Sequence, residues 1–380
     1  MRLGIVGCGQ IVLDGHVPAL LRAEHVEVVA TSDVVRSRAE LVARAFAGNG
    51  RPRAPRAYGD HRDMLERERL DLVLVGSPPS LHRRHVADAA AAGVHVLCEK
   101  PLATTLADAE AAVLACEESE VRLLMAHNYA SFEEYRRLPE LIRSGAIGVP
   151  HTAIFQGLGS NPWDGAPEYR PGWRYDASLS GGGRLMDAGV HALYLAEMVF
   201  GAAPVRVSAW MDFGPAGAPI DSRCFARYRF PTGVALLQIG EGHGGCAVEA
   251  IGEEGRIQLR FPNGRRYFDH SPGELHVYVD GELKMREQVP PRTVHLEPCF
   301  YADVAERLTG PHEYLHSGRH GRDLLATLLA TYVAASEGRD VDLPPELSEA
   351  LYAEGAAAAF NGSGATPAPA PSHISSNVAM

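Results

Sequence analysis

The first third of the chain alternates short apolar runs with longer alanine-rich segments, and this alternation is what most limits its fold. Each run is four to six residues long and rich in Val, Ile or Leu, as in parallel strands buried on both faces. The runs are Leu3–Val6, Val26–Thr31, Leu72–Val75, Val94–Cys98 and Leu123–Ala126. Between them, His85–Ala92 and Thr105–Glu118 have the pattern of helices. Strands joined by helices predict an α/β domain over residues 1–127, with a doubly wound parallel sheet.

The pattern changes after about residue 150, where strand-like segments are divided by turns such as Pro231-Thr232-Gly233. These segments are Val205–Phe213, Arg223–Phe230, Val234–Glu241, Ala247–Ile251, Arg256–Phe261 and Leu275–Val279. Two predicted helices follow, Cys299–Leu308 and Asp323–Glu337. A run of strands predicts an α+β domain over residues 128–345, with a largely antiparallel sheet. Residues 361–380 are mostly Ala, Pro, Ser and Gly, which predicts a disordered tail.

Charge and composition argue against several classes of protein. The chain has 36 Lys and Arg against 47 Asp and Glu, a formal net charge of −11, whereas binding nucleic acid requires clustered basic residues. No apolar stretch approaches the roughly 18 residues of a membrane span, and the apolar start is too short for a signal peptide. The six cysteines lack paired spacing, which favours reduced thiols. We therefore expect a soluble cytoplasmic protein with no membrane or nucleic-acid partner.

A glycine turn follows the first predicted strand. The segment Gly7-Cys8-Gly9-Gln10-Ile11-Val12 leads into a run that can open a helix. Gly7 permits a tight turn, Gly9 leaves the backbone open to a pyrophosphate, and the helix N-terminus supplies unpaired N–H groups. The usual third small residue is replaced by Val12. The turn predicts a dinucleotide site that includes Gly7, Gly9, Gln10 and Ile11.

Asp33, at the end of the second predicted strand, indicates which dinucleotide binds. It lies 21 positions beyond Val12, where a carboxylate can accept the ribose hydroxyls of the adenosine half, and this favours NAD over NADP. A turn aspartate or a helix cap is the alternative interpretation of Asp33. Arg36 and Arg38 follow closely and can hold a 2′-phosphate, so NADP is not excluded.

Three further residues have the types and positions that catalysis requires. Lys100 follows the strand Val94–Cys98 and precedes Pro101, so it projects from the carboxyl end of the sheet, where its ammonium can hold a substrate oxygen. Asp187 and His191 follow a glycine run and are four residues apart, so on a helix they share one face. A nearby carboxylate can fix the tautomer of a histidine that acts as a base. Each residue alone is explained as well by a surface lysine or a surface ion pair; together they predict a catalytic centre.

Segments spread in order over roughly residues 1–345 resemble the glucose–fructose oxidoreductase / inositol dehydrogenase / rhizopine-catabolism (Gfo/Idh/MocA) family. They are Gly7-Cys8-Gly9, His16-Val17-Pro18-Ala19-Leu20, Ser77-Pro78-Pro79-Ser80-Leu81-His82, Cys98-Glu99-Lys100-Pro101-Leu102, Gly172-Trp173-Arg174, residues 181–191, Phe230-Pro231-Thr232-Gly233 and Gly338-Arg339-Asp340-Val341-Asp342-Leu343-Pro344. The resemblance implies an N-terminal Rossmann domain and a C-terminal α+β domain whose open sheet often makes oligomer contacts. We therefore expect a homo-oligomer, either a dimer or a tetramer.

The resemblance also implies a role for each site residue. His191 accepts the proton of a substrate hydroxyl, Asp187 orients His191, and Lys100 holds the reacting oxygen. Outside the glycine turn and Asp33, the residues implied at the cofactor are Ser77, Pro78, His82, Glu99, Trp173 and Arg174.

Two positions depart from the family pattern, and both border the implied substrate cleft. Tyr194 stands where the family often has aspartate, three residues after the histidine, and Ala130 follows Tyr129 where an arginine is common. Tyr129, Tyr175 and Tyr194 are accordingly predicted to contact the substrate, whose class these departures leave open. No metal is expected, because the histidines at 82 and 85 and those at 312, 316 and 320 lack the setting of a metal site.

The sequence thus predicts an NAD-dependent enzyme, with NADP not excluded, that oxidises a secondary hydroxyl of a sugar, cyclitol or aminosugar or reduces the matching ketone. Two alternatives stay open. One is NAD-assisted glycoside hydrolysis, which gives no net reduction of the cofactor. The other is a non-catalytic sugar-sensing regulator, against which Lys100, Asp187 and His191 argue because a pure binder needs no base.

Overall fold

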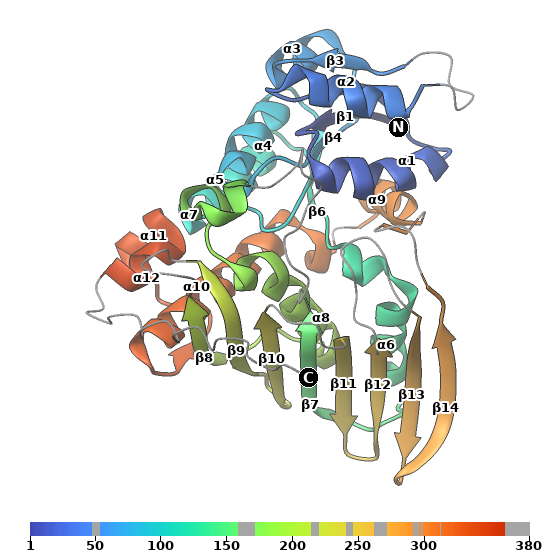
Figure 1. The fold of residues 1–380 in the computed structure, drawn as a ribbon, viewed down its shortest axis with the longest axis vertical. Coiled ribbons are helices and arrows are strands. Elements are labelled where there is room, and N and C mark those ends of the chain that lie inside the picture. The colour runs from blue at the N-terminus through green and yellow to red at the C-terminus, as the bar shows by residue number, and fades with distance from the viewer. Residues whose placement is uncertain are drawn as a thin grey trace, which may run out of the picture.

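Six parallel strands form the sheet of the N-terminal part (Figure 1). The computed structural model describes residues 1–47, 54–158, 172–213, 220–240, 246–261, 272–291, 296–297, 299–311 and 313–361. The strands are β1 (Arg2–Val6), β2 (Glu27–Ser32), β3 (Arg56–Tyr58), β4 (Leu72–Val75), β5 (His95–Cys98) and β6 (Leu123–Met125). Their order is β3-β2-β1-β4-β5-β6, which confirms the predicted doubly wound sheet. The order reverses between β1 and β4, the position at which such sheets bind ligands.

Helices connect these strands, as predicted. They are η1 (a π-helical segment, Ile11–His16), α1 (Val17–Arg22), α2 (Arg36–Ala45), α3 (His61–Arg67), η2 (a 3₁₀ turn, Pro79–Leu81), α4 (His82–Ala91) and α5 (Leu106–Glu118). Helix α4 begins three residues before its predicted start at His85, because the η2 turn runs directly into it. Strand β3 and helices α2 and α3 were not predicted. Strand β3 has only three residues, and the buried stripe of α2 is Ala39, Val42 and Ala43, so their apolar patterns are weak.

A nine-stranded sheet forms the second part, in the order β14-β13-β12-β11-β7-β10-β9-β8-β15. Its strands are β7 (Pro150–Leu158), β8 (Arg206–Phe213), β9 (Asp221–Arg229), β10 (Val234–Gly240), β11 (Cys246–Gly252), β12 (Gly255–Phe261), β13 (Gly273–Val279), β14 (Glu282–Val289) and β15 (Val341–Asp342). The pairing is antiparallel except between β7 and β10, which confirms the predicted largely antiparallel sheet. Strands β7, β14 and β15 were not predicted.

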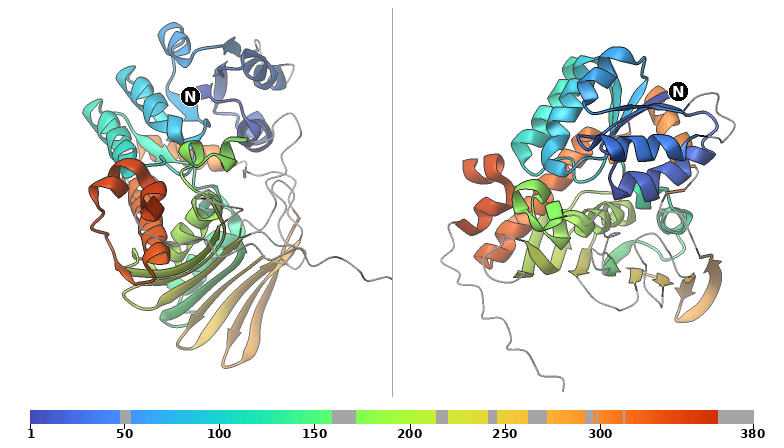
Figure 2. Two further views of the ribbon diagram at one scale, coloured as in Figure 1. Left: turned by 60° about the vertical axis from the view of Figure 1, so that its left-hand side comes forward. Right: turned by 45° about the horizontal axis from the view of Figure 1, so that its top comes forward.

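Helices cover one face of this sheet and leave the other open (Figure 2). The helical segments are η3 (Asn128–Ser131), α6 (Glu133–Arg143), η5 (Gly172–Tyr175), α7 (Ala177–Ser180), η6 (a π-helical segment, Leu185–Gly189), α8 (Val190–Phe200), α9 (Phe300–Thr309), η7 (Tyr314–His316), α10 (Gly318–Glu337), α11 (Glu349–Glu354), η8 (Gly355–Ala357) and α12 (Ala358–Asn361). Helix α8 packs on β7 and α10 on β8. On the open face Trp210, Phe225 and Leu236 are 54%, 43% and 41% exposed, and the rings of Trp210 and Phe225 lie 5.7 Å apart.

The chain returns to the first sheet before it ends. Phe300, Tyr301 and Val304 of α9 share a buried cluster with residues of β1 and α1, including Ile5 and Leu20. Helix α10 then packs along α5. These contacts from the C-terminal part hold the two sheets together, so the carboxyl ends of the parallel strands face the glycine segment that precedes α8.

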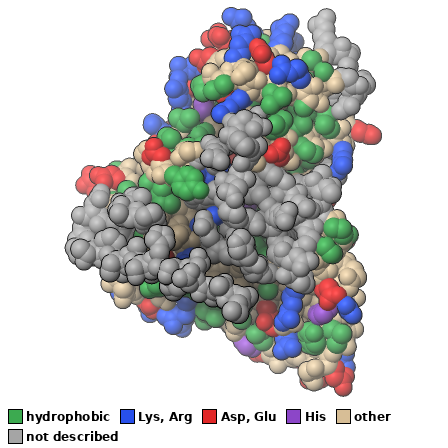
Figure 3. Space-filling model, viewed as in Figure 1, with side chains coloured by type: hydrophobic (Ala, Val, Ile, Leu, Met, Phe, Trp, Pro, Cys, Tyr) green, Lys and Arg blue, Asp and Glu red, His purple; other side chains and the backbone are tan. Residues whose placement is uncertain are grey.

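Several remaining predictions concern the chain as a whole. No helix among the described residues is long and apolar enough to cross a membrane. The cysteines at 8, 98, 116, 224, 246 and 299 are all free thiols. On the face drawn in Figure 3, basic and acidic side chains lie side by side over the N-terminal part. The predicted disordered tail falls almost entirely on residues 362–380, and these, like His312, lie outside the described residues.

Candidate active site

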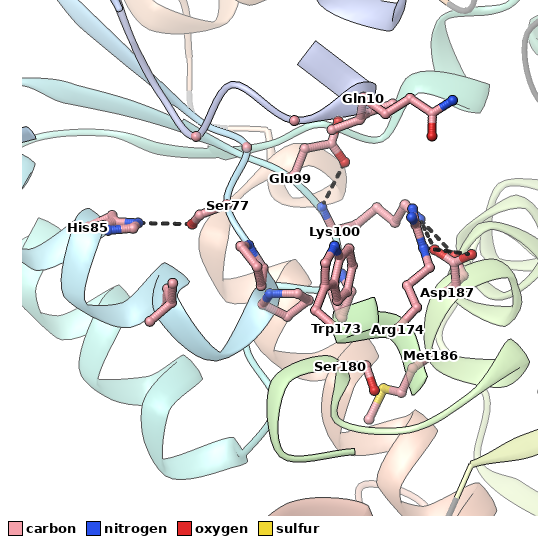
Figure 4. A pocket seen from close by; sticks show the side chains of 18 of the residues that line it. Gln10, Ser77, His85, Glu99, Lys100, Trp173, Arg174, Ser180, Met186 and Asp187 are labelled. Atoms are coloured by element: carbon pink, nitrogen blue, oxygen red, sulfur yellow. Dashed lines mark hydrogen bonds and ion pairs between the residues drawn. The ribbon is translucent and has the colours of Figure 1, made fainter. Parts of the chain in front are cut away.

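A cavity of about 540 Å³ lies between the carboxyl ends of the parallel strands and the segments that lead into α8. This is the size range of cofactor and small-molecule sites. Most of the predicted site residues line it: Gly7, Gly9, Gln10, Ile11, Asp33, Ser77, Pro78, Glu99, Lys100, Tyr129, Trp173, Arg174, Asp187 and His191. Residues from both parts of the chain therefore share one site, as Figure 4 shows for Lys100, Trp173, Arg174 and Asp187.

The glycine turn is built for close approach. Gly7 has φ +84°, and a β-carbon there would lie 2.6 Å from the backbone nitrogen of Ser77, so only glycine fits. A β-carbon on Gly9 would have no neighbour within 4 Å, so on the cavity side the backbone of Gly9 is open to a ligand. The chain then enters η1 at Ile11, with a helix N-terminus beside the cavity. The turn thus fits the pyrophosphate of a dinucleotide.

Asp33 follows β2 and is fixed by two backbone donors. Its Oδ2 accepts a hydrogen bond from Cys8 N and its Oδ1 accepts one from Val35 N, both at 2.8 Å. Each oxygen keeps a further acceptor position for a ligand hydroxyl. Arg38 also lines the cavity, whereas Arg36 does not and pairs with Glu40 at 3.3 Å. Of the two arginines that follow Asp33, only Arg38 is thus placed to meet a 2′-phosphate.

Lys100 and Asp187 form the charged centre of the site (Figure 4). The Lys100 ammonium donates to the Asp187 carbonyl oxygen at 2.7 Å and to its Oδ1 at 3.1 Å, and Arg174 Nε lies 4.0 Å from Oδ2. Burial by itself would raise the pKa of the Asp187 carboxyl. The charges of Lys100 and Arg174 outweigh burial and hold that pKa well below its usual range. Asp187 is therefore a carboxylate at neutral pH, and it holds the lysine ammonium in place.

His191 lines the cavity with only 7% of its surface exposed. Its Nδ1 lies 2.7 Å from the hydroxyl of Tyr194, and the ring of Tyr129 stacks on it at 4.3 Å between centroids. Asp187, the predicted orienting partner of His191, lies against Lys100 and Arg174 in the π-helical segment η6.

Three of the predicted site residues are not among the described residues that line the cavity. Tyr194 is fully buried next to His191 and does not line the cavity, so we propose no substrate contact for it. His82 is also fully buried. Its ring nitrogens lie 2.7 Å from the Ser77 carbonyl and 3.0 Å from the Pro101 carbonyl, so it braces the two cavity loops from behind. Tyr175 is 61% exposed at the end of η5 and lies outside the residues that line the cavity.

Sequence reasoning missed the support behind Glu99. Glu99 Oε1 lies 2.9 Å from His16 Nε2, and His16 Nδ1 lies 2.6 Å from the Tyr301 hydroxyl of α9. Glu99 Oε2 also accepts from the backbone nitrogen of Lys100 at 3.1 Å. In the sequence, only the family resemblance of the segment His16-Val17-Pro18-Ala19-Leu20 pointed to His16. No pattern or motif pointed to Tyr301. This chain of contacts anchors the segment that carries Lys100.

Three buried histidines lie behind Tyr194. The ring of His127 is 5.8 Å from that of His316 and 5.2 Å from that of His320. His320 Nε2 lies 2.5 Å from Glu197 Oε2. No group of three or more His, Cys, Asp or Glu residues within the described ranges is arranged to hold a metal ion. Burial lowers the pKa of His316 to about 3 and that of His127 well below its usual range, so both are neutral in the folded protein.

These histidines make the fold sensitive to acid. Between pH 6.5 and about 3, His316 binds a proton only in the unfolded chain, so the free energy of unfolding falls as pH falls across this window. One such histidine contributes up to about 1.4 kcal/mol per pH unit. We expect His316→Gln to flatten the pH dependence of urea unfolding between pH 6.5 and 4.5 by about that slope. The exposed His151→Gln is the control, and an unchanged slope in His316→Gln would contradict the prediction.

Comparison with known proteins agrees with this architecture. A family model described as "Oxidoreductase family, NAD-binding Rossmann fold" matches residues 1–127, and one described as "GFO/IDH/MocA C-terminal domain" matches residues 135–258. The uncharacterized oxidoreductase ORF334 of Rhizobium meliloti is 31% identical over 277 residues, which are 71% of this chain and 77% of that protein. The D-apiose dehydrogenase of Paraburkholderia graminis is 29% identical over 382 residues, which cover 95% of this chain and 93% of that protein.

A solved structure extends the match to nearly the whole fold. The aldose-aldose oxidoreductase from Caulobacter crescentus, complexed with glycerol, has a TM-score of 0.75 and 25% identity, covering 90% of this chain and 99% of that one. The fold and the glycine turn define a Rossmann oxidoreductase that uses a nicotinamide dinucleotide. The chain belongs to the Gfo/Idh/MocA family.

Proposed function

We propose that this protein oxidises a secondary hydroxyl of a sugar, cyclitol or aminosugar with NAD, or reduces the matching ketone. The observation that carries the proposal is the common cavity. It joins a glycine turn fit for a dinucleotide to a fixed lysine ammonium and a histidine. The sugar dehydrogenases and oxidoreductases among its relatives support the substrate class.

The residues divide the reaction between them. The chemistry that a bound nicotinamide supplies is acceptance of a hydride from the carbinol carbon. Lys100 donates a hydrogen bond to the substrate oxygen and stabilises the negative charge that develops on it. His191 takes the hydroxyl proton on Nε2, since its Nδ1 faces Tyr194. The glycine turn and Asp33 would hold the dinucleotide, with Trp173 and Arg174 approaching from the second part of the chain.

NAD is the proposed cofactor because of the position of Asp33. A fixed carboxylate accepts hydrogen bonds from the two ribose hydroxyls of NAD and repels the 2′-phosphate of NADP. Arg38 on the same cavity wall weakens that repulsion. We therefore expect a preference for NAD rather than complete exclusion of NADP.

A substrate panel tests the proposal. Polyols, sugars, cyclitols and aminosugars are each incubated with enzyme and either NAD or NADP, and the reduced cofactor is followed by absorbance. We expect reduction with at least one such substrate, faster with NAD than with NADP. Release of free sugar from a glycoside without net cofactor reduction would favour glycoside hydrolysis instead. Ligand binding with neither reaction would favour a sensor.

Self-association is part of the same proposal. The open face of the nine-stranded sheet exposes Trp210, Phe225 and Leu236, and large exposed apolar patches mark interaction surfaces. Light scattering coupled to size-exclusion chromatography tests it. A mass of two or four chains supports a homo-oligomer, and a single-chain mass contradicts it.

A further inference from the structure

Two tyrosines hold the ring of His191 in place. The Tyr129 ring stacks on the imidazole, with 4.3 Å between centroids and 15° between planes. The Tyr194 hydroxyl lies 2.7 Å from Nδ1 and also accepts a hydrogen bond from the backbone nitrogen of Tyr129 at 3.1 Å. Tyr129 therefore restrains the face of the imidazole ring, and Tyr194 restrains its Nδ1.

Tyr194 is itself held rigidly. It lies on α8, three residues beyond His191, and its side chain is fully buried. Its ring stacks on His127 at 4.5 Å and 26°, and His127 Nδ1 lies 3.0 Å from the carbonyl of Leu315. A carbonyl oxygen can only accept, so that nitrogen of His127 carries a proton. A phenol packed in this way presents its oxygen to His191 at a fixed position.

We propose that the Tyr194 hydroxyl is the positioning residue that sets the tautomer of His191. This inference rests on the proposed function, in which Nε2 of His191 accepts the substrate proton. Nε2 can accept that proton only when it is unprotonated, so Nδ1 must carry the single ring proton of the neutral imidazole and donate it to an acceptor. The phenol oxygen has two acceptor positions. The Tyr129 N–H occupies one, and the other faces Nδ1, which requires the phenol's own proton to point away from His191.

A hydroxyl acts differently from a carboxylate at this position. Both accept the Nδ1 proton, but a neutral oxygen stabilises the imidazolium less than a charged one would. His191 then returns its proton more readily, which suits an enzyme that works in both directions. The Asp187 carboxylate pairs with the Lys100 ammonium, whereas the Tyr194 hydroxyl is the group that lies 2.7 Å from His191 Nδ1.

The main test compares Tyr194→Phe with Tyr228→Phe. Tyr228 of β9 is equally buried, its hydroxyl lies 2.7 Å from Thr331 Oγ1 of α10, and neither residue lines the cavity. Each variant removes one buried hydroxyl, which has two contacts in Tyr194 and one in Tyr228, so both should show a fall in melting temperature, the larger one in Tyr194→Phe. We expect kcat to fall about tenfold to a hundredfold in Tyr194→Phe alone, with the substrate KM and the NADH affinity within about twofold of wild type.

The pH profile separates positioning from simple destabilisation. Without the phenol oxygen the imidazolium loses its acceptor, so the acidic limb of kcat/KM for oxidation should move to lower pH by about half a unit to one unit. The other groups near His191 are Lys100, Asp187 and Arg174 on the cavity side, Tyr129 on its face and His127 behind Tyr194. Neither variant alters them. An unshifted limb in Tyr194→Phe would overturn the proposal.

A measurement on the wild-type protein covers the case in which Tyr194→Phe does not fold. In ¹⁵N-histidine-labelled enzyme, the His191 signals are assigned by their loss in His191→Gln. We expect neutral His191 to carry its proton on Nδ1; a proton on Nε2 would overturn the inference. Wild-type turnover in Tyr194→Phe together with an inactive His191→Ala would refute this inference alone. Wild-type turnover in both variants would refute the proposed function.

Discussion

The His191→Ala substitution is expected to lower kcat by about 10²–10⁴-fold and to leave the affinity for NADH within about twofold of wild type. The imidazole is the base of the proposed reaction, while the proposed dinucleotide site is made by other residues of the cavity, the glycine turn and Asp33. Steady-state kinetics on the best substrate of the panel gives kcat. Quenching or enhancement of NADH fluorescence gives the affinity. The two readouts therefore separate the chemical step from cofactor binding.

His191→Asn is the matched control for this experiment. Asparagine keeps a polar group near Tyr194 but cannot exchange a proton near neutral pH, so it should be nearly as inactive as alanine. Wild-type turnover in His191→Ala would contradict the assignment of the base. A parallel loss of NADH binding would mean that the substitution disturbs the whole cavity, so that His191 has a structural role instead.

Most of the buried strands could be predicted because burial produces a pattern in the sequence. Strands β1, β4 and β5 have neighbours on both sides and are apolar except for Arg2 and His95, the first residues of β1 and β5, and β9 and β10 alternate buried and exposed residues. Strand β14 is different. It lies at the edge of its sheet and reads Glu-Leu-Lys-Met-Arg-Glu-Gln-Val, with a mostly charged surface. Charged residues on an edge strand prevent sheets from pairing with one another. They also leave the strand without the apolar pattern from which a strand is predicted.

The sequence predicted which residues line the cavity more completely than it predicted which side chains contact one another there. Gly7, Asp33 and Lys100 follow strand ends, and the carboxyl ends of parallel strands meet at one edge, so their common cavity follows from topology. The partners of Asp187 and His191 do not follow in this way. Residue spacing indicates a shared helix face but not which neighbours a side chain meets, and Asp187 lies against Lys100 and Arg174. Which side of α8 faces the cavity depends on tertiary packing, and that packing buries Tyr194.

The support for Lys100 illustrates the same limit. Glu99 contacts His16, and His16 contacts Tyr301. Glu99 directly follows β5, His16 lies in η1 and Tyr301 lies in α9. No local pattern connects segments so far apart in the chain. Sequence reasoning finds groups that chemistry requires at strand ends, and the structure is needed to find the side chains that hold them in position.

The Lys100→Met substitution is expected to lower kcat/KM by about 10²–10³-fold, the cost of losing one donor to a developing oxyanion. It should also destabilise the fold, because the Asp187 carboxylate loses the ammonium that lies 3.1 Å from its Oδ1. Breaking a buried pair costs about 3–5 kcal/mol. We expect about 2 kcal/mol, less than that range, because Arg174 still lies 4.0 Å from Asp187 and the pair is 14% and 20% exposed. Urea unfolding measures this loss.

A double variant separates the catalytic role of Lys100 from its structural one. Lys100→Met/Asp187→Asn removes both charges of the pair, so part of the lost stability should return while activity stays low; the recovery is incomplete because Arg174 loses the carboxylate at 4.0 Å. Lys100→Arg keeps the charge but changes the donor geometry, and it should recover stability with only partial activity. If the double variant regained wild-type kcat/KM, Lys100 would serve only to neutralise Asp187, and the substrate oxygen would be held by another group. Continued inactivity in a stable double variant, with activity retained in Asp187→Asn alone, assigns the ammonium to the reaction itself.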